Sequence, residues 1–136
     1  MNTIELRLEP GTTPGGPVVH IRIDGRDLID RIRAIELPQA TGDGQPELAG
    51  SYGYLEPGDW PDVREGKEEL VTVLGCDCGV VECWPLRARM RRRGGVVVWS
   101  HFQQPNRGWT YERLGPFTFR EAEYDRAVAS VAKHVA

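Results

Sequence analysis

The clearest structural pattern in the chain lies at residues 84–99, which read WPLRARMRRRGGVVVW. In the first half, apolar side chains alternate with proline and arginine, the period of two that is typical of a strand with one buried face. Gly94 and Gly95 then provide a turn of two residues, and residues 96–99 return as a second, apolar strand. The segment therefore predicts an antiparallel hairpin that is rich in arginine.

Three more strands are predicted upstream of this hairpin. Residues 3–9 and 19–23 each alternate apolar and polar side chains, and the Gly- and Pro-rich segment between them allows them to pair antiparallel. Residues 69–75 contain a short apolar run, which is typical of a central strand with both faces buried. Residues 38–67 are rich in glycine, proline and acidic residues and predict a long loop.

Two segments have the periodicity of amphipathic helices. Residues 27–37 place leucine and isoleucine at helical spacing, and Pro38 is expected to end this short helix. The second segment is residues 120–136, and its apolar stripe consists of Tyr124, Val128, Val131 and Val135. A single stripe predicts that this C-terminal helix packs on the sheet.

The order of the elements predicts a single α+β domain over residues 1–136. Its mostly antiparallel sheet contains the N-terminal strand pair, the central strand and the arginine-rich hairpin, together with a short helix and a packed C-terminal helix. A chain of 136 residues with a hydrophobic fraction of 40% is able to bury one core. It has neither an apolar run long enough to cross a membrane nor the pattern of a secretion signal after Met1, so we expect a cytoplasmic protein.

The charge balance argues against a general nucleic-acid or anionic-membrane binder. The formal net charge is -3 and the pI is near 5.6, whereas such proteins carry a positive field. The local exception is the run of Arg87, Arg89, Arg91, Arg92 and Arg93. This run could bind phosphates, but the simpler interpretation is a solvated face balanced by acids of neighbouring strands. The acids expected to balance it are Glu5, Glu9, Glu68 and Glu69.

All three cysteines, Cys76, Cys78 and Cys83, lie within eight residues on a turn between two predicted strands. Three converging thiolates are a partial zinc site, because protein-bound zinc takes four ligands in a tetrahedron. The candidates for the fourth ligand are His20, His101, His134, Asp77 and Glu82, none of them at a diagnostic spacing. A reactive thiol with His101 as its base is a second alternative. The leading interpretation is metal-free thiols that fill the turn, as free cysteines commonly do in the cytosol.

A segment rich in aromatic and polar side chains follows the hairpin, at residues 99–111. Its candidate binding residues are Trp99, His101, Phe102, Gln104, Arg107 and Trp109. Rings offer contact area to a ligand and polar groups fix its orientation, a composition typical of a small-molecule or peptide pocket. The alternative is that the rings simply anchor a loop, since no acid–base pair accompanies them.

Three motifs in the second half of the chain resemble those of a known group of proteins. They are LGCDCG running to CWPL at residues 74–86, WSHFQQPNR at residues 99–107 and LGPFTF at residues 114–119. The series resembles a group of small uncharacterised bacterial proteins with the pattern C-x-C-G…C-W-P-L, W-x-x-F-x-Q-P and L-G-P-F-x-F. The group has no established function, so the resemblance implies relatives and no activity.

Motifs of common enzyme classes do not occur in the sequence, which lacks a P-loop, a dinucleotide fingerprint, a zinc-protease motif and a serine-hydrolase elbow. The leading hypothesis is therefore a small cytoplasmic, non-enzymatic module without a cofactor. It would bind a protein partner or a small ligand near the cysteine turn and residues 99–111. The alternative is a zinc-binding or thiol-redox protein that acts through Cys76, Cys78 and Cys83.

Overall fold

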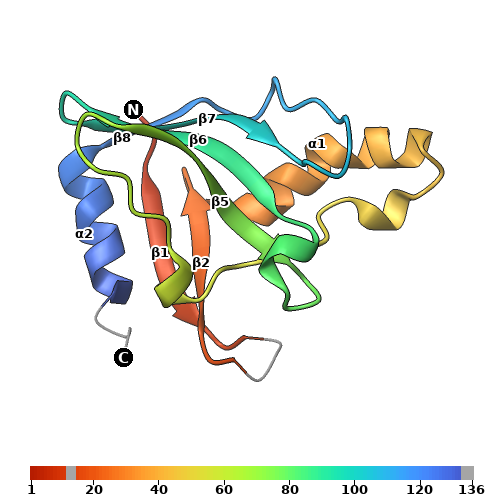
Figure 1. Cartoon of the computed structure of the whole chain (residues 1–136), viewed down its shortest axis with the longest axis horizontal. Coiled ribbons are helices and arrows are strands. Elements are labelled where there is room, and N and C mark those ends of the chain that lie inside the picture. Colours follow the sequence, from red (N-terminus) through yellow and green to blue (C-terminus); the bar gives the residue numbers. More distant parts are fainter. Residues whose placement is uncertain (12–14, 133–136) are drawn as a thin grey trace.

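The computed structural model describes residues 1–11 and 15–132 and contains two antiparallel sheets with two helices (Figure 1). The elements are β1 Ile4–Glu9, β2 Val18–Ile23, β3 Arg26–Asp27, α1 Leu28–Gly42, β4 Tyr52–Gly53, β5 Glu68–Cys76, β6 Leu86–Arg93, β7 Val96–Gln103, β8 Phe117–Arg120 and α2 Glu121–Ala132. Three short 3₁₀ helices occupy Pro46–Leu48, Pro57–Asp59 and Val81–Cys83. The predicted α+β class and the antiparallel pairing are confirmed. The expected single sheet is in fact two, because β2 pairs with β1 and β3 and not with a strand of the hairpin sheet.

The first sheet has the strand order β1-β2-β3, and the second has the order β4-β5-β6-β7-β8. In the second sheet, the predicted hairpin joins β6 to β7, with Arg93 opposite Val96. Gly94 and Gly95 have φ values of 62° and 80° in its turn, a left-handed conformation that glycine adopts without strain. The paired N-terminal strands are likewise confirmed, with Leu6 opposite Ile21.

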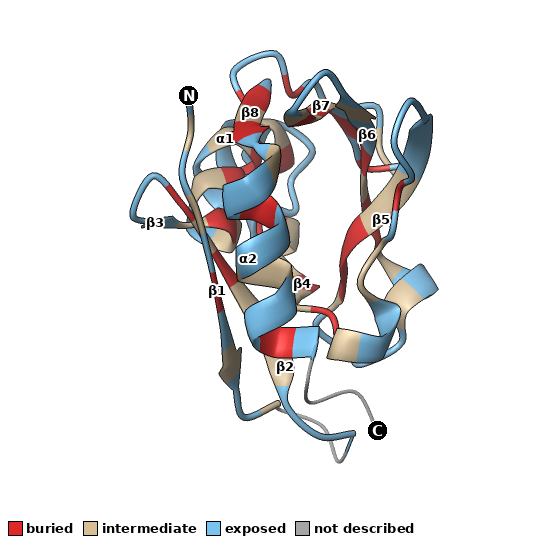
Figure 2. Cartoon of the chain, turned by 90° about the vertical axis from the view of Figure 1, so that its left-hand side faces the viewer, coloured by how far each residue is buried: buried red, intermediate tan, exposed pale blue. Residues whose placement is uncertain are grey.

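The hydrophobic core lies between the two sheets and α2. Figure 2 shows α2 flanked by the N-terminal sheet and by β5–β7, with buried residues on the surfaces that face the interior. Trp99 is fully buried and packs edge-on against Phe119 and Tyr124, with ring centroids 5.6 Å and 6.2 Å apart. Tyr124 and Val131 of the predicted helical stripe are buried, so the packing of α2 is confirmed for the described part of the helix. Val135 lies outside the described residues.

Helix α1 is longer than predicted, because Pro38 lies inside it instead of ending it. Proline removes one helical N–H and crowds the carbonyl one turn earlier, which normally destabilises a helix interior. Here the last turns are held by long-range contacts. The Gln39 side chain donates to the carbonyl of Thr110 at 2.9 Å and accepts from its N–H at 2.8 Å. Helical periodicity alone does not report such contacts.

Strand β5 is central only at its end, which corrects the prediction of a strand buried on both faces. Its pairing with β4 is limited to Gly75 and Cys76, so the first half of β5 is a sheet edge. Val73, Leu74 and Gly75 are accordingly buried, whereas Leu70 is 45% exposed. Among the described residues, no helix is both long and apolar enough to cross a membrane.

The predicted loop over residues 38–67 is shorter than expected, because α1, two 3₁₀ helices and β4 occupy parts of it. The arginine run divides between two surfaces. Arg87 pairs with Glu82 at 3.0 Å, an acid of the cysteine turn that was not among the predicted partners. Arg92 instead reaches α2, where it pairs with Asp125 at 2.9 Å and lies over the ring of Tyr124. It therefore links the hairpin to the C-terminal helix.

Candidate functional site

The three cysteines converge on the turn between β5 and β6. Their Sγ atoms all lie within 4.8 Å of one another. Gly79 has a φ of 92°, and its N–H donates to the Cys76 carbonyl at 3.1 Å, which closes a tight turn after Cys78. The 3₁₀ helix Val81–Cys83 then returns Cys83 toward the other two thiols.

The first two thiols differ in environment and in acidity. Cys76 is partly buried, and this burial raises the pKa of its thiol to about 12. Cys78 is exposed, and hydrogen bonds, above all that from the Cys76 side chain, lower the pKa of its thiol. The N–H of Cys78 also donates to Cys76 Sγ at 3.4 Å. In the absence of metal, Cys78 is therefore the thiol that ionises before Cys76.

The cluster consists of three ligands. Among the described residues, the three cysteines form a group of potential metal ligands whose ligand atoms lie within 4.8 Å of one another. No His, Asp or Glu of these residues belongs to the group. Of the predicted fourth ligands, Glu82 pairs with Arg87, and the Asp77 carboxylate accepts from the Cys76 thiol at 3.7 Å. His134 lies outside the described residues. A metal held by the three thiolates would keep one open position for water or another ligand.

A cavity of about 290 Å³ opens beside the cysteine turn, and its lining includes Cys76, His20 and Tyr54. His20 Nε2 lies 2.5 Å from Asp27 Oδ2, and the Tyr54 hydroxyl donates to Asp27 Oδ1 at 2.9 Å. Burial opposes ionisation of Asp27, but hydrogen bonds from the Asp30 N–H, Tyr54 and His20 outweigh it and hold the pKa of Asp27 below its usual range. The ionised carboxylate therefore fixes the orientation of the His20 ring.

Half of the predicted binding residues are part of the core. Trp99, Phe102 and Gln104 are all buried, and Gln104 is only 2% exposed. The Gln104 side chain donates to the Pro85 carbonyl at 3.0 Å and to the Tyr52 hydroxyl at 3.2 Å. Its polar groups are thus used within the protein.

Arg107 and Trp109 anchor the segment after β7 to the end of α1. Arg107 donates to Gln45 Oε1 at 2.7 Å, and Trp109 Nε1 donates to Asp43 Oδ2 at 2.9 Å. Arg107 also lies over the ring of Trp84, 5.5 Å from its centroid. These contacts match the alternative in which the aromatic segment holds a loop in place.

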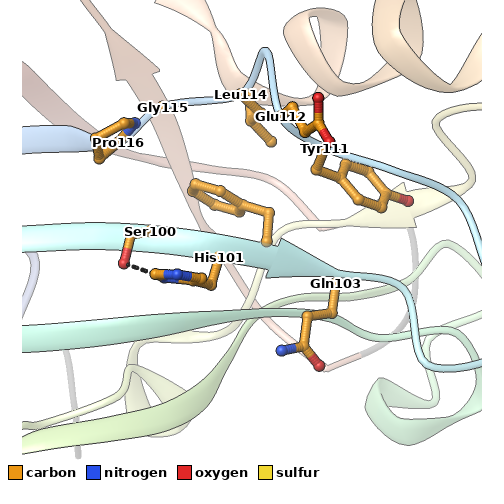
Figure 3. Close-up of a pocket in the computed structure, with 9 residues that line it drawn as sticks. Ser100, His101, Gln103, Tyr111, Glu112, Leu114, Gly115 and Pro116 are labelled. Atoms are coloured by element: carbon orange, nitrogen blue, oxygen red, sulfur yellow. Dashed lines mark hydrogen bonds between the residues drawn. The ribbon is translucent and has the colours of Figure 1, made fainter.

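A second cavity, of about 410 Å³, lies between the end of β7 and residues 111–116 (Figure 3). His101 and Phe102 line it together. His101 has a φ of 51°, a left-handed conformation that side-chain-bearing residues seldom adopt. The β6–β7 register shifts at this point, and His101 Nδ1 lies 2.9 Å from Ser100 Oγ. The structure thus separates His101 from Arg107 and Trp109 instead of joining all six predicted residues in one site.

Two groups of partly or fully buried polar residues were not predicted, although His20 itself was named as a candidate zinc ligand. One is the His20–Asp27–Tyr54 set, which joins β2 to the segment after α1 and has no short-range signature. The other is centred on Glu36, which is fully buried. Its position was detectable in principle, because Glu36 follows Ile32 and precedes Ala40 at spacings of four, on the buried face of α1.

Comparison with known proteins does not assign the chain to a family. No family model, no curated protein and no solved structure matches it. The resemblance to small bacterial proteins therefore stays a prediction, and the function has to be argued from the geometry of the site.

Proposed function

We propose that the chain is a zinc-binding protein with Cys76, Cys78 and Cys83 as ligands. The convergence of their Sγ atoms within 4.8 Å carries this proposal. With zinc–sulfur bonds of about 2.3 Å, the sulfur atoms of a tetrahedral site lie about 3.8 Å apart, so small side-chain movements are sufficient to complete it. A disulfide would explain the approach of two sulfur atoms only.

The surroundings of the thiols also favour a bound cation. The N–H of Cys78 points to the sulfur of Cys76, and such bonds stabilise the negative charge of a thiolate ligand. Three thiolates and one Zn²⁺ have a combined charge of -1, which is tolerated at a turn where two of the cysteines are exposed. The ion would hold the turn between β5 and β6, and its open position would accept water or a ligand.

Elemental analysis of the purified protein tests the proposal directly. We expect about one zinc per chain, three thiols protected from alkylation, and a melting temperature that falls when a chelator is added, because metal-binding free energy contributes to folding. Serine at any of the three cysteine positions should remove most of the metal. Glu82→Gln is the matched control, since Glu82 lies in the same turn but pairs with Arg87, and it should retain the metal.

Two other outcomes would contradict zinc binding. Less than about 0.1 equivalent of metal and a melt that ignores the chelator would indicate metal-free thiols that fill the turn. Absence of metal together with one thiol that is alkylated unusually fast would indicate a reactive cysteine. The lowered pKa of the Cys78 thiol predicts that Cys78 is this reactive cysteine.

One observation favours a second candidate function, ligand binding at the cavity beside β7. His101 keeps a strained backbone conformation there, and such strain often accompanies binding sites. His101→Gly should relieve it and raise the free energy of unfolding by about 0.5–1 kcal/mol relative to His101→Ala. Equal stability of the two variants would remove the basis for this candidate.

A further inference from the structure

The cavity beside the cysteine turn is lined by hydrogen-bond acceptors. Its polar and aromatic lining includes Glu9, His20, Tyr52, Tyr54, Cys76 and Asp77. The two carboxylates, of Glu9 and Asp77, carry negative charge, and among the described residues neither lysine nor arginine lines the cavity. Its field therefore favours a cation over an anion or a neutral molecule.

The hydroxyl groups of the two tyrosines are already engaged. Tyr52 donates to the buried carboxylate of Glu36, and Tyr54 donates to Asp27. Both tyrosines nevertheless line the cavity, and an aromatic ring interacts favourably with a positive charge. The tyrosines thus offer apolar surface to the alkyl part of a ligand and leave the donor groups to be supplied by the ligand itself.

His20 provides an acceptor atom without a partner. Its Nε2 faces the Asp27 carboxylate, which accepts hydrogen bonds only, so Nε2 carries a proton. With that tautomer of the neutral ring, Nδ1 has a free lone pair. Among the described residues, this buried Nδ1 atom has no hydrogen-bond partner. A buried acceptor without a partner costs free energy, which a donor group of a ligand would recover.

The position of Glu9 specifies the kind of donor. Its Oε1 lies 3.9 Å from His20 Nδ1, too far for a direct hydrogen bond. Two acceptors at this separation can be bridged by one nitrogen atom that lies about 2.9 Å from each. A primary ammonium group has three N–H donors and a positive charge, and it matches both acceptors at once.

We infer that this cavity binds a small primary amine, with its ammonium group held between the Glu9 carboxylate and Nδ1 of His20. The alkyl chain lies against the tyrosine rings. A volume of about 290 Å³ is suited to a chain of a few carbon atoms, not to a folded partner. The site does not require zinc, although a zinc–thiolate centre of net negative charge at Cys76 would strengthen its attraction for cations.

Titration with n-butylammonium, followed by amide NMR, tests the inference. At about pH 8, ordinary imidazoles are neutral and primary amines are protonated. We expect shifts at Gly53 and Gly79, which line the cavity, with a dissociation constant on the order of millimolar for a fragment this small. N-butyltrimethylammonium has the same chain and charge but no N–H donor, and it should bind about tenfold more weakly. Equal binding of the two would contradict the inference.

Variants separate the proposed contacts from general charge effects. Glu9→Gln and His20→Ala should each weaken butylammonium binding by about five- to tenfold. Glu5→Gln is the matched control, because it removes an exposed carboxylate of the same strand that pairs with Arg7 outside the cavity, and it should leave binding unchanged. Similar losses in Glu9→Gln and Glu5→Gln would indicate attraction to net charge alone and would contradict the inference. Circular dichroism verifies that each variant is folded. If His20→Ala does not fold, Glu9→Gln alone decides the test.

The zinc content of the same samples distinguishes this inference from the proposed function. Butylammonium binding by protein that contains no zinc would support the amine site while contradicting the metal site. Loss of bound metal in His20→Ala, without any amine binding in the parent protein, would show that His20 serves a metal and would overturn the amine site.

Discussion

Replacement of Glu36 would show how much its buried polar network, formed with Gly50, Tyr52 and Tyr111, stabilises the fold. The Glu36 carboxylate is fully buried and accepts three hydrogen bonds. The Gly50 N–H donates to Oε1 at 2.8 Å, and the hydroxyls of Tyr52 and Tyr111 each donate to Oε2 at 2.5 Å. Glu36→Leu removes all three acceptors at similar volume, whereas Glu36→Gln keeps the shape and removes the charge.

The expected cost follows from the groups that lose their partners. In Glu36→Leu the two hydroxyls can bond each other, because they converge on one oxygen atom, so one hydroxyl and the Gly50 N–H stay unpaired. At about 1–3 kcal/mol for each unpaired buried group, the free energy of unfolding falls by about 2–6 kcal/mol. Removal of a desolvated charge offsets part of this loss and favours the lower half of the range. Glu36→Gln retains one acceptor oxygen and should cost about 1–2 kcal/mol.

Urea unfolding followed by tryptophan fluorescence measures these differences, since the fully buried Trp99 becomes solvated on unfolding. A loss of 2–6 kcal/mol is a large part of the roughly 5–15 kcal/mol available to a domain of this size. The exposed Glu47 provides the control, and Glu47→Gln should change stability by less than about 0.5 kcal/mol. An unchanged transition in Glu36→Leu, or a larger loss in Glu36→Gln than in Glu36→Leu, would refute the reasoning.

Three further predictions concern other parts of the fold. Val131→Asp buries an unpaired charge on α2 and should cost about 3–5 kcal/mol, whereas an unchanged thermal melt would show that α2 does not support the core. Arg92→Gln should cost about 1–3 kcal/mol by urea unfolding and the exposed Arg89→Gln less than about 0.5 kcal/mol, so equal losses would contradict the role of Arg92 in linking hairpin to helix. Burial raises the pKa values of Tyr54 and Tyr111, so the unfolded chain deprotonates first and stability should fall as the pH rises above about 10. Tyrosinate absorbance that rises near pH 10 before unfolding begins would contradict this expectation.

The fold was predictable where the local pattern and the environment agree. In residues 84–99, apolar and polar side chains alternate along the first strand, and two glycines form the turn that follows it. Both features depend only on residues that are neighbours in the sequence. The errors arose where distant segments decide the outcome. Pro38 is tolerated in α1 because Gln39 bonds to Thr110, and Leu70 is exposed because β4 covers only the end of β5. Neither contact can be predicted from the residues that are neighbours in the sequence.

The candidate site was predictable in its cysteines and not in its surroundings. Cys76, Cys78 and Cys83 are close in sequence, so a single turn brings them together. His20 reaches the same cavity from β2, more than fifty residues away, and composition says nothing about that approach. Trp99 illustrates the opposite error, since an aromatic residue beside polar neighbours can be either a ligand contact or a core residue. Burial decides between the two, and burial depends on the whole fold.

Hydrogen bonds and strand pairing connect the buried polar network of Glu36 to the cysteine turn. Tyr52, which donates to Glu36, is the residue of β4 that pairs with Cys76, and the N–H of Asp77 donates to the Ser51 carbonyl at 3.3 Å. On the other side of the turn, the Asn106 side chain donates to the Cys83 carbonyl at 3.1 Å, and the neighbouring Gln104 bonds to Tyr52. Both ends of the turn are therefore tied to the same buried carboxylate. A hydrophobic residue at Glu36 would bury more readily, but it would not hold the two segments that bring the three thiols together.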